Sequence, residues 1–242
     1  MKKPDITMFF PAYNEVENIP KLLGSATGIL DKVAGNYEIL VVVYEGSTDG
    51  TIDLVKKYSA GNKKIRLIIQ PKEKKGVGYA NILGFKNARY PYIFYADSDN
   101  QFDISEFKKF LPYIGKYDVI AGYRIKRRDP KTRIIVSKIY NIMMRILMGA
   151  RERDLDCAFR LVGKKVINKV SLTCCTGVST TELLVKARKH GFRIKEIGIN
   201  HYPRLFGKPV FELETGLNLP KPKVVMGILK ETLRLWADLY LR

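Results

Sequence analysis

Short apolar runs alternate with segments of helical periodicity through the first half of this 242-residue chain. The apolar runs predict strands at Ile6–Phe10, Glu38–Tyr44, Ile65–Gln70, Tyr92–Ala96 and Asp118–Gly122. The segments between them predict helices near Glu17–Val33, Thr51–Ser59, Tyr79–Ala88 and Ile104–Tyr113. Strands that alternate with helices form mostly parallel sheets with helices on both faces. The sequence therefore predicts an α/β fold.

The second half has a different pattern. Helices are expected at Lys131–Gly149 and Ser179–His190, and a strand at Arg193–Asn200. A loop rich in Pro and Gly follows from Tyr202 to Pro222, and Lys223–Arg242 has the periodicity of an amphipathic helix. No segment reaches the roughly 20 apolar residues of a membrane-spanning helix.

The charge balance points to anionic ligands. The chain has 43 Lys and Arg against 24 Asp and Glu, a formal net charge of +19. Such a field attracts nucleotides, nucleic acid or an anionic membrane surface. The three cysteines form neither a disulfide framework nor a metal-binding spacing, which favours a reducing compartment. The apolar run near the N-terminus is too short for a secretion signal, so we expect a cytoplasmic protein that is soluble or lies on a membrane.

Asp97-Ser98-Asp99 directly follows the predicted strand Tyr92–Ala96, and Asn100-Gln101 comes next. Open α/β sheets bind ligands at the carboxyl edge of their strands. Two carboxylates one residue apart suit a hard divalent cation that bridges a diphosphate. The same pattern also occurs in solvated loops that cap a helix, so it needs support from other motifs.

Two earlier strand ends supply that support. Phe9–Glu15 closes the first strand, and Glu45–Thr51 closes the second with small residues that let a nucleotide approach the backbone. Neither the G-x-G-x-x-G fingerprint of dinucleotide-binding folds nor a P-loop is present. A dehydrogenase of the Rossmann type is therefore disfavoured.

Arg133, Ser137 and Asn141 are spaced to share one face of a helix whose other faces are rich in isoleucine. One interpretation is a core helix with a polar stripe. The other is a helix at a membrane surface, with the stripe on a lipid phosphate and nearby lysines and arginines on anionic headgroups. The C-terminal segment, with Trp236 and Tyr240, is either a second interfacial helix or a docking helix.

Together, P-A-Y-N-E, G-S-T-D-G-T and D-S-D-N-Q resemble the nucleotide-sugar half of family 2 inverting glycosyltransferases, which have the GT-A fold. Within that family the sequence is most similar to dolichyl-phosphate mannose synthases and related polyprenyl-phosphate glycosyltransferases. The likeness runs from about Asp5 to Lys208 and includes Asp154–Arg160 and His201–Lys208. It implies a GT-A domain over residues 1–220 and a C-terminal amphipathic helix over 221–242.

The resemblance also implies residue roles. The nucleotide sugar would be bound by Pro11, Ala12, Tyr13, Glu15, Glu45, Asp49, Asp97 and Ser98. Mg²⁺ or Mn²⁺ would be held by Asp97, Asp99 and Gln101. The acceptor phosphate would contact Arg124, Arg133 and Ser137, and the catalytic residues would be Asp99, Arg124 and Arg204. Glu182 is a further candidate on the acceptor side. The family often has two Asp before the G-S segment, whereas this chain has Tyr44 and Glu45, which leaves the nucleotide base open.

The implied reaction is metal-dependent, inverting transfer of a hexose, mannose or glucose, from GDP-mannose or UDP-glucose to a polyprenyl (dolichyl) phosphate. A phosphate monoester is mostly ionised at neutral pH, so its attack needs no strong general base. We expect a cytoplasmic enzyme, peripheral on the cytoplasmic face of an anionic membrane, attached directly or through a membrane-protein partner. A glycan or protein acceptor is the alternative. A nucleic-acid-binding protein is a remote one, because the basic residues form no recognised nucleic-acid module.

Overall fold

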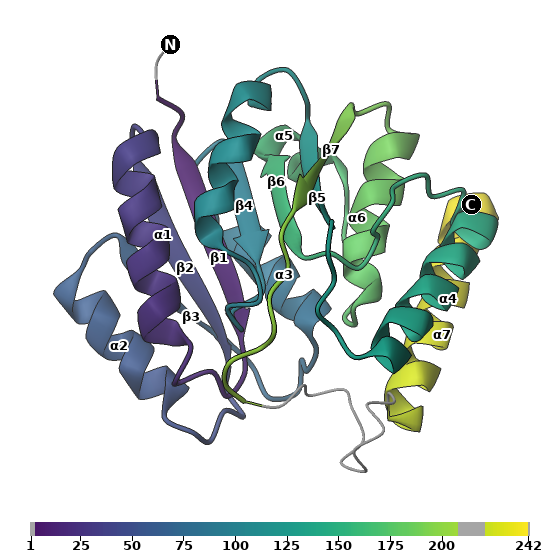
Figure 1. Ribbon diagram of the computed structural model, residues 1–242. Helices are drawn as coiled ribbons and strands as arrows, with labels where there is room; N and C mark the ends of the chain where they lie inside the picture. Colours follow the sequence, from purple (N-terminus) through teal and green to yellow (C-terminus); the bar gives the residue numbers. More distant parts are fainter. Residues whose placement is uncertain (1–2, 208–220, 242) are drawn as a thin grey trace.

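The computed structural model describes residues 3–207 and 221–241 and has a seven-stranded sheet at its centre (Figure 1). The strand order is β3-β2-β1-β4-β6-β5-β7. The strands are β1 (Ile6–Ala12), β2 (Tyr37–Tyr44), β3 (Ile65–Gln70), β4 (Tyr92–Ala96), β5 (Val119–Arg124), β6 (Phe159–Gly163) and β7 (Ile194–Ile199). Only β6 runs antiparallel to its neighbours, β4 and β5. The predicted, mostly parallel α/β sheet is confirmed.

Helices cover both faces of the sheet because successive side chains of a strand point to opposite sides. In β1, Met8 and Phe10 belong to one core cluster and Phe9 to the other. The first cluster contains side chains of α1 (Ile19–Val33), α2 (Thr51–Gly61) and the 3₁₀ helix η1 (Ile104–Tyr113). The second contains side chains of α3 (Val77–Asn87), α5 (Lys164–Lys169) and α6 (Val178–Lys189).

Three elements differ from the sequence-based expectations. β6 and α5 were not predicted, and Ile104–Tyr113, predicted as a helix, is a 3₁₀ helix with Pro112 inside it. β6 could not be recognised in the sequence because it is only five residues long and has an arginine at its second position. That arginine, Arg160, is fully buried and bonds to main-chain oxygens, so the strand fills a central place in the sheet despite its charge.

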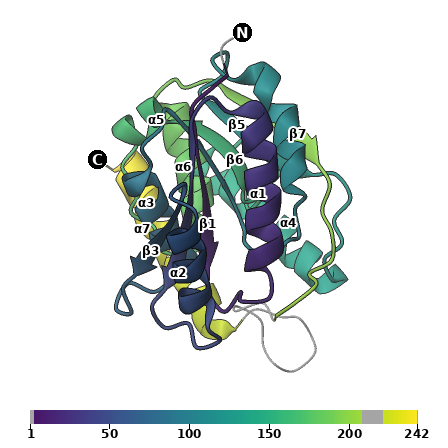
Figure 2. The same cartoon turned by 90° about the vertical axis from the view of Figure 1, so that its left-hand side faces the viewer.

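Two further helices pack at the side of the domain, beyond α6. They are α4 (Lys131–Met148) and α7 (Pro222–Tyr240), and α7 packs against both α6 and α4 (Figures 1 and 2). Met144 and Met148 of α4 are buried, as are Leu235 and Leu239 of α7. No helix in residues 3–207 and 221–241 is long and apolar enough to cross a membrane. Most of the loop predicted at Tyr202–Pro222, including Lys208, lies outside the described residues, as does Arg242.

Candidate active site at the carboxyl edge of the sheet

The three predicted metal ligands, Asp97, Asp99 and Gln101, follow the end of β4 at a tight corner. Ser98 Oγ donates to the Pro11 carbonyl at 2.7 Å, which fixes the corner against the end of β1. Asn100 has a left-handed backbone (φ 56°), and its amide donates to the carbonyl and side-chain oxygens of Asn18. Ser98 and Pro11 therefore shape the corner through their mutual bond. Their contact with a nucleotide sugar stays a prediction.

The β1 and β2 loops are tied together by side chains that the sequence assigned to nucleotide binding. Asp49 accepts from the Val16 amide at 3.0 Å and from the Thr51 amide at 2.9 Å. Thr51 Oγ1 in turn accepts from the Glu15 amide at 2.9 Å. Hydrogen bonds to the carboxylate outweigh the effect of burial and lower the pKa of Asp49. Asp49 thus positions the two loops, and a nucleotide would meet a preformed surface.

An aromatic pair stands where these loops meet. The rings of Tyr13 and Tyr44 lie edge to face with centroids 5.5 Å apart. Tyr44 Oη donates to the Lys72 carbonyl at 3.0 Å, and the exposed Glu45 carboxylate accepts from the Lys72 amide at 3.1 Å. Tyr44, the residue that departs from the family pattern, therefore gives this end of the site an aromatic side chain in place of a carboxylate.

Arg204 connects the first loop with the β4 corner. Its guanidinium forms an ion pair with Glu15 and another with Asp99 at 3.3 Å, and its Nε donates to the Phe206 carbonyl at 2.7 Å. Gln101 anchors the same segment, because its Nε2 donates to the Tyr202 carbonyl at 3.1 Å. The structure thus brings together four residues of the predicted site, Glu15, Asp99, Gln101 and Arg204, and their roles there stay predictions.

The pKa values of the two carboxyl groups at this corner, Asp97 and Asp99, are both raised. Burial raises the pKa of Asp97, the Asp99 carboxylate adds to the shift, and Arg133 and Arg124 oppose it. Burial also raises the pKa of Asp99, against the effect of Arg204. Among the described residues, the Asp97 side chain has no hydrogen-bond or ion-pair partner. A cation placed between the two carboxylates would relieve their repulsion.

The donor set fits a hard divalent cation only in part. Mg²⁺ commonly binds one or two carboxylates and completes its shell with substrate phosphates and water. Asp97, Asp99 and the carbonyl oxygen of Gln101 match that pattern. Nowhere in residues 3–207 and 221–241 do three His, Cys, Asp or Glu side chains gather as a metal site. The remaining ligands would have to come from a bound diphosphate.

The predicted acceptor residues form a dense ionic cluster between β5 and α4. Arg124 donates two bonds to Asp154, at 2.7 and 2.6 Å, and contacts Asp156 at 3.0 Å. Arg133 pairs with Asp129 at 3.2 Å. Ser137 is buried, with its hydroxyl 3.0 Å from both oxygens of Asp156. The structure therefore confirms that Arg133 and Ser137 share the inward face of α4.

Sequence reasoning missed the acids of this cluster. Burial acts to raise the pKa of Asp156, but Arg124 and Arg127 outweigh it and hold that pKa far below its usual value. Arg127 also donates to Ser137 Oγ at 2.6 Å. Asp154 and Asp156 stand in the segment that carried the family resemblance, but their pairing with arginines 30 positions away along the chain needs the tertiary fold.

Glu182, a candidate for the acceptor side, has a different place. Its fully buried carboxylate accepts from the amides of Thr173 and Cys174 at 3.0 and 2.9 Å. Glu231 of α7 accepts from the next two amides, of Cys175 and Thr176, at 2.7 and 2.9 Å. These two carboxylates, the loop clamp, fix residues 173–176. Glu182 is therefore structural, and its expected role beside the acceptor is wrong.

The clamped loop supports the segment after β3. The Gly78 amide donates to the Cys175 carbonyl at 2.9 Å. A Cβ atom on Gly78 would lie 2.4 Å from the Cys174 carbonyl oxygen, and one on Gly76 would lie 2.2 Å from that of Cys175. Gly76 also has a backbone φ of 122°, which residues other than glycine rarely adopt. Glycine at both positions lets the two loops pack against each other.

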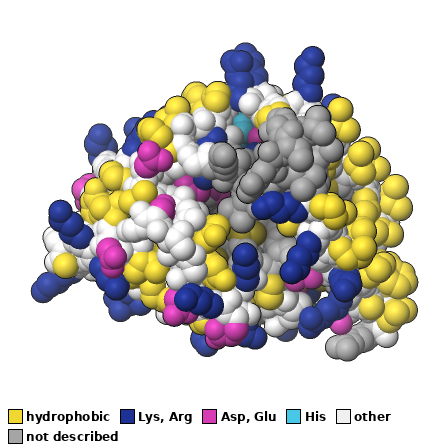
Figure 3. Space-filling model, turned by 90° about the horizontal axis from the view of Figure 1, so that it is seen from below, with side chains coloured by type: hydrophobic (Ala, Val, Ile, Leu, Met, Phe, Trp, Pro, Cys, Tyr) yellow, Lys and Arg dark blue, Asp and Glu magenta, His cyan; other side chains and the backbone are white. Residues whose placement is uncertain are grey.

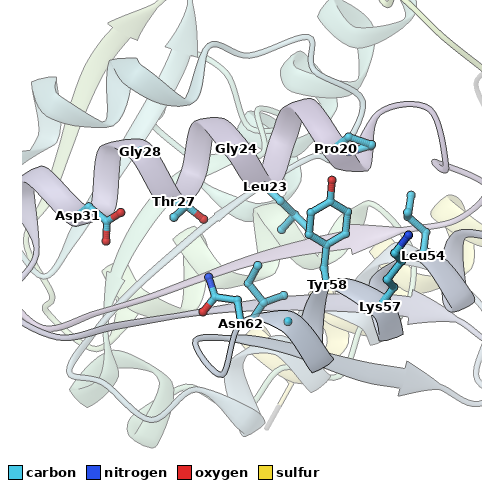
Figure 4. A pocket seen from close by; sticks show the side chains of 12 residues that line it. Pro20, Leu23, Gly24, Thr27, Gly28, Asp31, Leu54, Lys57, Tyr58 and Asn62 are labelled. Atoms are coloured by element: carbon cyan, nitrogen blue, oxygen red, sulfur yellow. The ribbon is translucent and has the colours of Figure 1, made fainter.

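One cavity lies away from this chemistry. It has a volume of about 750 Å³ between α1 and α2 and is lined by Leu23, Gly24, Gly28 and Tyr58 among others (Figure 4). None of the predicted site residues lines it. We assign the chemistry to the carboxyl edge of the sheet, because the buried carboxylates and arginines gather there.

Comparison with known proteins identifies the family of the chain. Residues 7–174 match the family model described as glycosyl transferase family 2. Undecaprenyl-phosphate 4-deoxy-4-formamido-L-arabinose transferase of Aeromonas hydrophila is 26% identical over 217 residues, covering 88% of this chain and 65% of that protein. The corresponding protein of Pectobacterium atrosepticum is 25% identical over 216 residues, covering 89% and 65%. The chain thus spans about two thirds of the length of these curated relatives.

Solved structures give the fold. Glucosyl-3-phosphoglycerate synthase from Mycobacterium tuberculosis, in complex with Mn²⁺, UDP and phosphoglyceric acid, superposes with a TM-score of 0.67. The alignment covers 95% of this chain and 78% of that chain at 15% identity. The same enzyme with Mg²⁺ and UDP gives a TM-score of 0.65 at 16% identity, covering 95% and 79%. At these identities the likeness establishes a shared GT-A architecture.

Proposed function

The chain belongs to glycosyl transferase family 2, and on that basis we propose that it transfers a sugar, with inversion, from a nucleotide sugar to a polyprenyl phosphate. One observation carries the proposal most directly. The Asp99 carboxylate adds to the rise in the pKa of the buried Asp97, and the nearby charges of Arg133 and Arg124 lower it. A site for a cation and diphosphate therefore adjoins a site for a second phosphate, as transfer to a phosphate acceptor requires.

The donor half would be bound by the loops after β1, β2 and β4. Asp97, Asp99 and Gln101 would hold Mg²⁺ or Mn²⁺, which acts as a Lewis acid on a leaving diphosphate. Arg204 would add positive charge on the same side, because it lies against Asp99 and Glu15. M. tuberculosis glucosyl-3-phosphoglycerate synthase is described in complex with Mn²⁺ and UDP, which supports a divalent cation in this fold.

The acceptor half would be bound by Arg124, Arg133 and Ser137. A lipid phosphate is already ionised near neutral pH, so the site has to hold and orient it rather than remove a proton. Arginine suits this role because its planar guanidinium binds phosphate through two parallel hydrogen bonds. The relatives from Aeromonas and Pectobacterium carry undecaprenyl phosphate in their names, which supports a polyprenyl acceptor.

A donor screen would identify the sugar and the base of the donor. Mannose or glucose, from GDP-mannose or UDP-glucose, is our expectation, whereas the two relatives are named for an arabinose derivative. The defining assay is a donor screen with Mg²⁺ or Mn²⁺ and a short polyprenyl phosphate. Transfer that requires the lipid phosphate supports the proposal. Donor hydrolysis that no lipid phosphate redirects would contradict it.

We place the outer faces of α4 and α7 on a membrane. Exposed apolar side chains line α4 at Ile135, Ile139, Ile142 and Ile146, the last with 77% of its surface accessible. On α7 they are Met226, Leu229, Leu233, Trp236 and Tyr240. We call these two sets the apolar face. Figure 3 shows hydrophobic side chains gathered on the side of the molecule where α4 and α7 lie, with lysines and arginines nearby. Exposed apolar area on this scale marks an interaction surface.

The proposal extends to place and organisation. The enzyme would lie peripherally on the cytoplasmic face of an anionic membrane, attached directly or through a membrane-protein partner. Residues 1–220 would form the catalytic domain and residues 221–242 its amphipathic extension. The packing of α7 against α6 and α4 supports an extension that is docked on the domain.

Replacing Arg133 or Ser137 with alanine should weaken the acceptor more than the donor. Each loses a hydrogen bond to a charged group, which costs on the order of 1.5–3 kcal/mol, or about 10- to 150-fold in acceptor KM. Both KM values are measured for each variant. Thr132→Ala, an exposed change on the same helix, is the control. If the donor KM alone rises, the polar stripe faces the nucleotide instead.

Binding to anionic liposomes should be sensitive to salt but not abolished by it. Each basic residue near the surface contributes about 1 kcal/mol at low salt and less under screening. Insertion of the apolar face should leave a component that salt does not remove. Flotation at two salt concentrations measures both. Ile139→Ser with Ile146→Ser should lose the salt-resistant component only. Absence of flotation under all conditions would show that the acceptor lipid reaches the enzyme by another route.

A further inference from the structure

A second cavity, of about 390 Å³, opens between α4 and the end of β5. Its outer part is lined by Tyr123, Lys138, Ile142, Arg145 and Arg153, and its buried inner wall includes Arg124, Ser137 and the carboxylate of Asp154. The inner wall belongs to the acceptor cluster described above. No role has yet been given to the three cations of the outer part.

These three cations lack acidic partners. Within residues 3–207 and 221–241, the side chains of Lys138, Arg145 and Arg153 form no ion pair with a carboxylate. Arg145 donates instead to the carbonyls of Glu152 and Arg153 at 3.1 and 3.2 Å. The Arg153 guanidinium lies over the Tyr123 ring, 4.9 Å from its centroid. Carbonyl groups therefore hold the Arg145 side chain and an aromatic ring holds that of Arg153, and none of these groups carries a negative charge.

The neighbouring arginines show the opposite arrangement. Arg124 pairs with Asp154, Arg127 with Asp129 at 2.9 Å, and Arg133 with Asp129. The cavity lining thus holds one carboxylate, Asp154, which is already paired with Arg124, and three cations that form no ion pair within the described part of the chain. Three cations that line one cavity repel one another, and a bound anion would reduce that repulsion. Phosphate accepts several hydrogen bonds from guanidinium and ammonium groups at once.

The position of the cavity indicates what carries that anion. Ile142 lines the cavity and is itself 53% exposed, as part of the apolar face. Lys138 and Arg145 are also exposed and alternate along α4 with Ile135, Ile139 and Ile146. The cavity therefore opens at the border of the surface that we place on the membrane, at the depth where lipid headgroups lie.

We propose that the outer part of this cavity binds the headgroup phosphate of an anionic membrane phospholipid. This site shares a cavity with Arg124 and Ser137 of the acceptor cluster, but it is formed by the outer residues Lys138, Arg145 and Arg153. It rests on the proposed membrane placement of α4. A bound headgroup would hold α4 in one orientation, with its isoleucines in the lipid and its polar stripe toward Asp97.

The test compares two variants that remove the same charge. Lys138→Gln with Arg153→Gln removes two of the three outer cations of the cavity, and Lys108→Gln with Lys116→Gln removes two exposed lysines elsewhere. Binding is measured with vesicles of phosphatidylcholine, with and without phosphatidylglycerol. We expect the cavity variant to bind phosphatidylglycerol vesicles about tenfold more weakly than the control variant. Lys138→Glu alone, an exposed change, should reproduce the direction of the loss if the double variant folds poorly.

Three results would overturn the proposal. Equal losses in both variants would show that overall charge, and no built site, is responsible. Competition by inorganic phosphate as strong as that by a short-chain phosphatidylglycerol, at equal ionic strength, would indicate a phosphate site without lipid preference. A raised KM for a water-soluble short polyprenyl phosphate, with vesicle binding unchanged, would assign the cavity to the acceptor. If the wild type transfers no sugar but the cavity variant still loses vesicle binding, the proposed function fails and the lipid site stands.

Discussion

Asp99→Ala is expected to reduce sugar transfer by on the order of a thousandfold, because a metal acting as Lewis acid contributes several kcal/mol to such a reaction. Asp99 is buried at the end of β4, beside Asp97 and 3.3 Å from Arg204. Its removal takes one of two carboxylates from the cation and leaves Arg204 with Glu15 as its acidic partner. The initial rate of transfer is measured at several concentrations of Mg²⁺ and Mn²⁺.

The same variant should keep its fold, because Asp99 lies at the edge of the sheet outside the hydrophobic core clusters. Thermal unfolding and circular dichroism check this. Asp53→Ala is the matched control, since the side chain of Asp53 is 86% exposed on α2, and it should leave the rate unchanged. Full activity of Asp99→Ala at ordinary metal concentrations would remove Asp99 from the cation site.

Arg160→Ala should destabilise the domain by about 3–5 kcal/mol, a large part of the 5–15 kcal/mol typical of a folded domain. The Arg160 side chain is fully buried in β6. It donates to the carbonyls of Thr180 and Leu155, the latter at 2.7 Å, and to Tyr95 Oη at 3.4 Å. Alanine would leave a cavity, and the carbonyls of Thr180 and Leu155 would each have one donor fewer. Urea denaturation measures the loss.

Arg160→Met separates the two causes. It keeps much of the side-chain volume and should lose only the hydrogen-bonding part, about 1–3 kcal/mol. Arg151→Ala, at an exposed position, should change stability by about 0.5 kcal/mol or less. An unchanged urea midpoint in Arg160→Ala would mean that the buried guanidinium contributes nothing to the stability of this sheet.

The sheet could be predicted from sequence wherever a strand is a continuous apolar run. β1, β2, β3 and β4 are such runs, and each was placed to within two residues at either end. β6 could not be found in this way. Its short run contains Arg160, and a buried arginine in a strand makes sense only when the carbonyl groups of the surrounding loops are known.

The candidate site could likewise be predicted only where it follows directly from the ends of apolar strands. Local patterns located Asp97 and Asp99, because a strand end is visible in the sequence. Patterns could not show that the Asp49 carboxylate would accept a hydrogen bond from the Val16 amide. Nor could they show that Asp154 and Asp156 would pair with Arg124. Those contacts join segments 30 or more residues apart, and their geometry is set by the packing of the whole sheet.

The loop clamp has a consequence for the order in which the molecule is built. Glu231 bonds to the Cys175 amide across 56 residues of chain. A chain leaves the ribosome from its N-terminus, so β4 and the corner with Asp97 and Asp99 emerge long before α7 does. The carbonyls behind Gly76 and Gly78 gain this support only after Glu231 has been synthesised. A nascent chain that has completed its sheet would therefore still wait for α7 before the segment after β3 reaches its final shape.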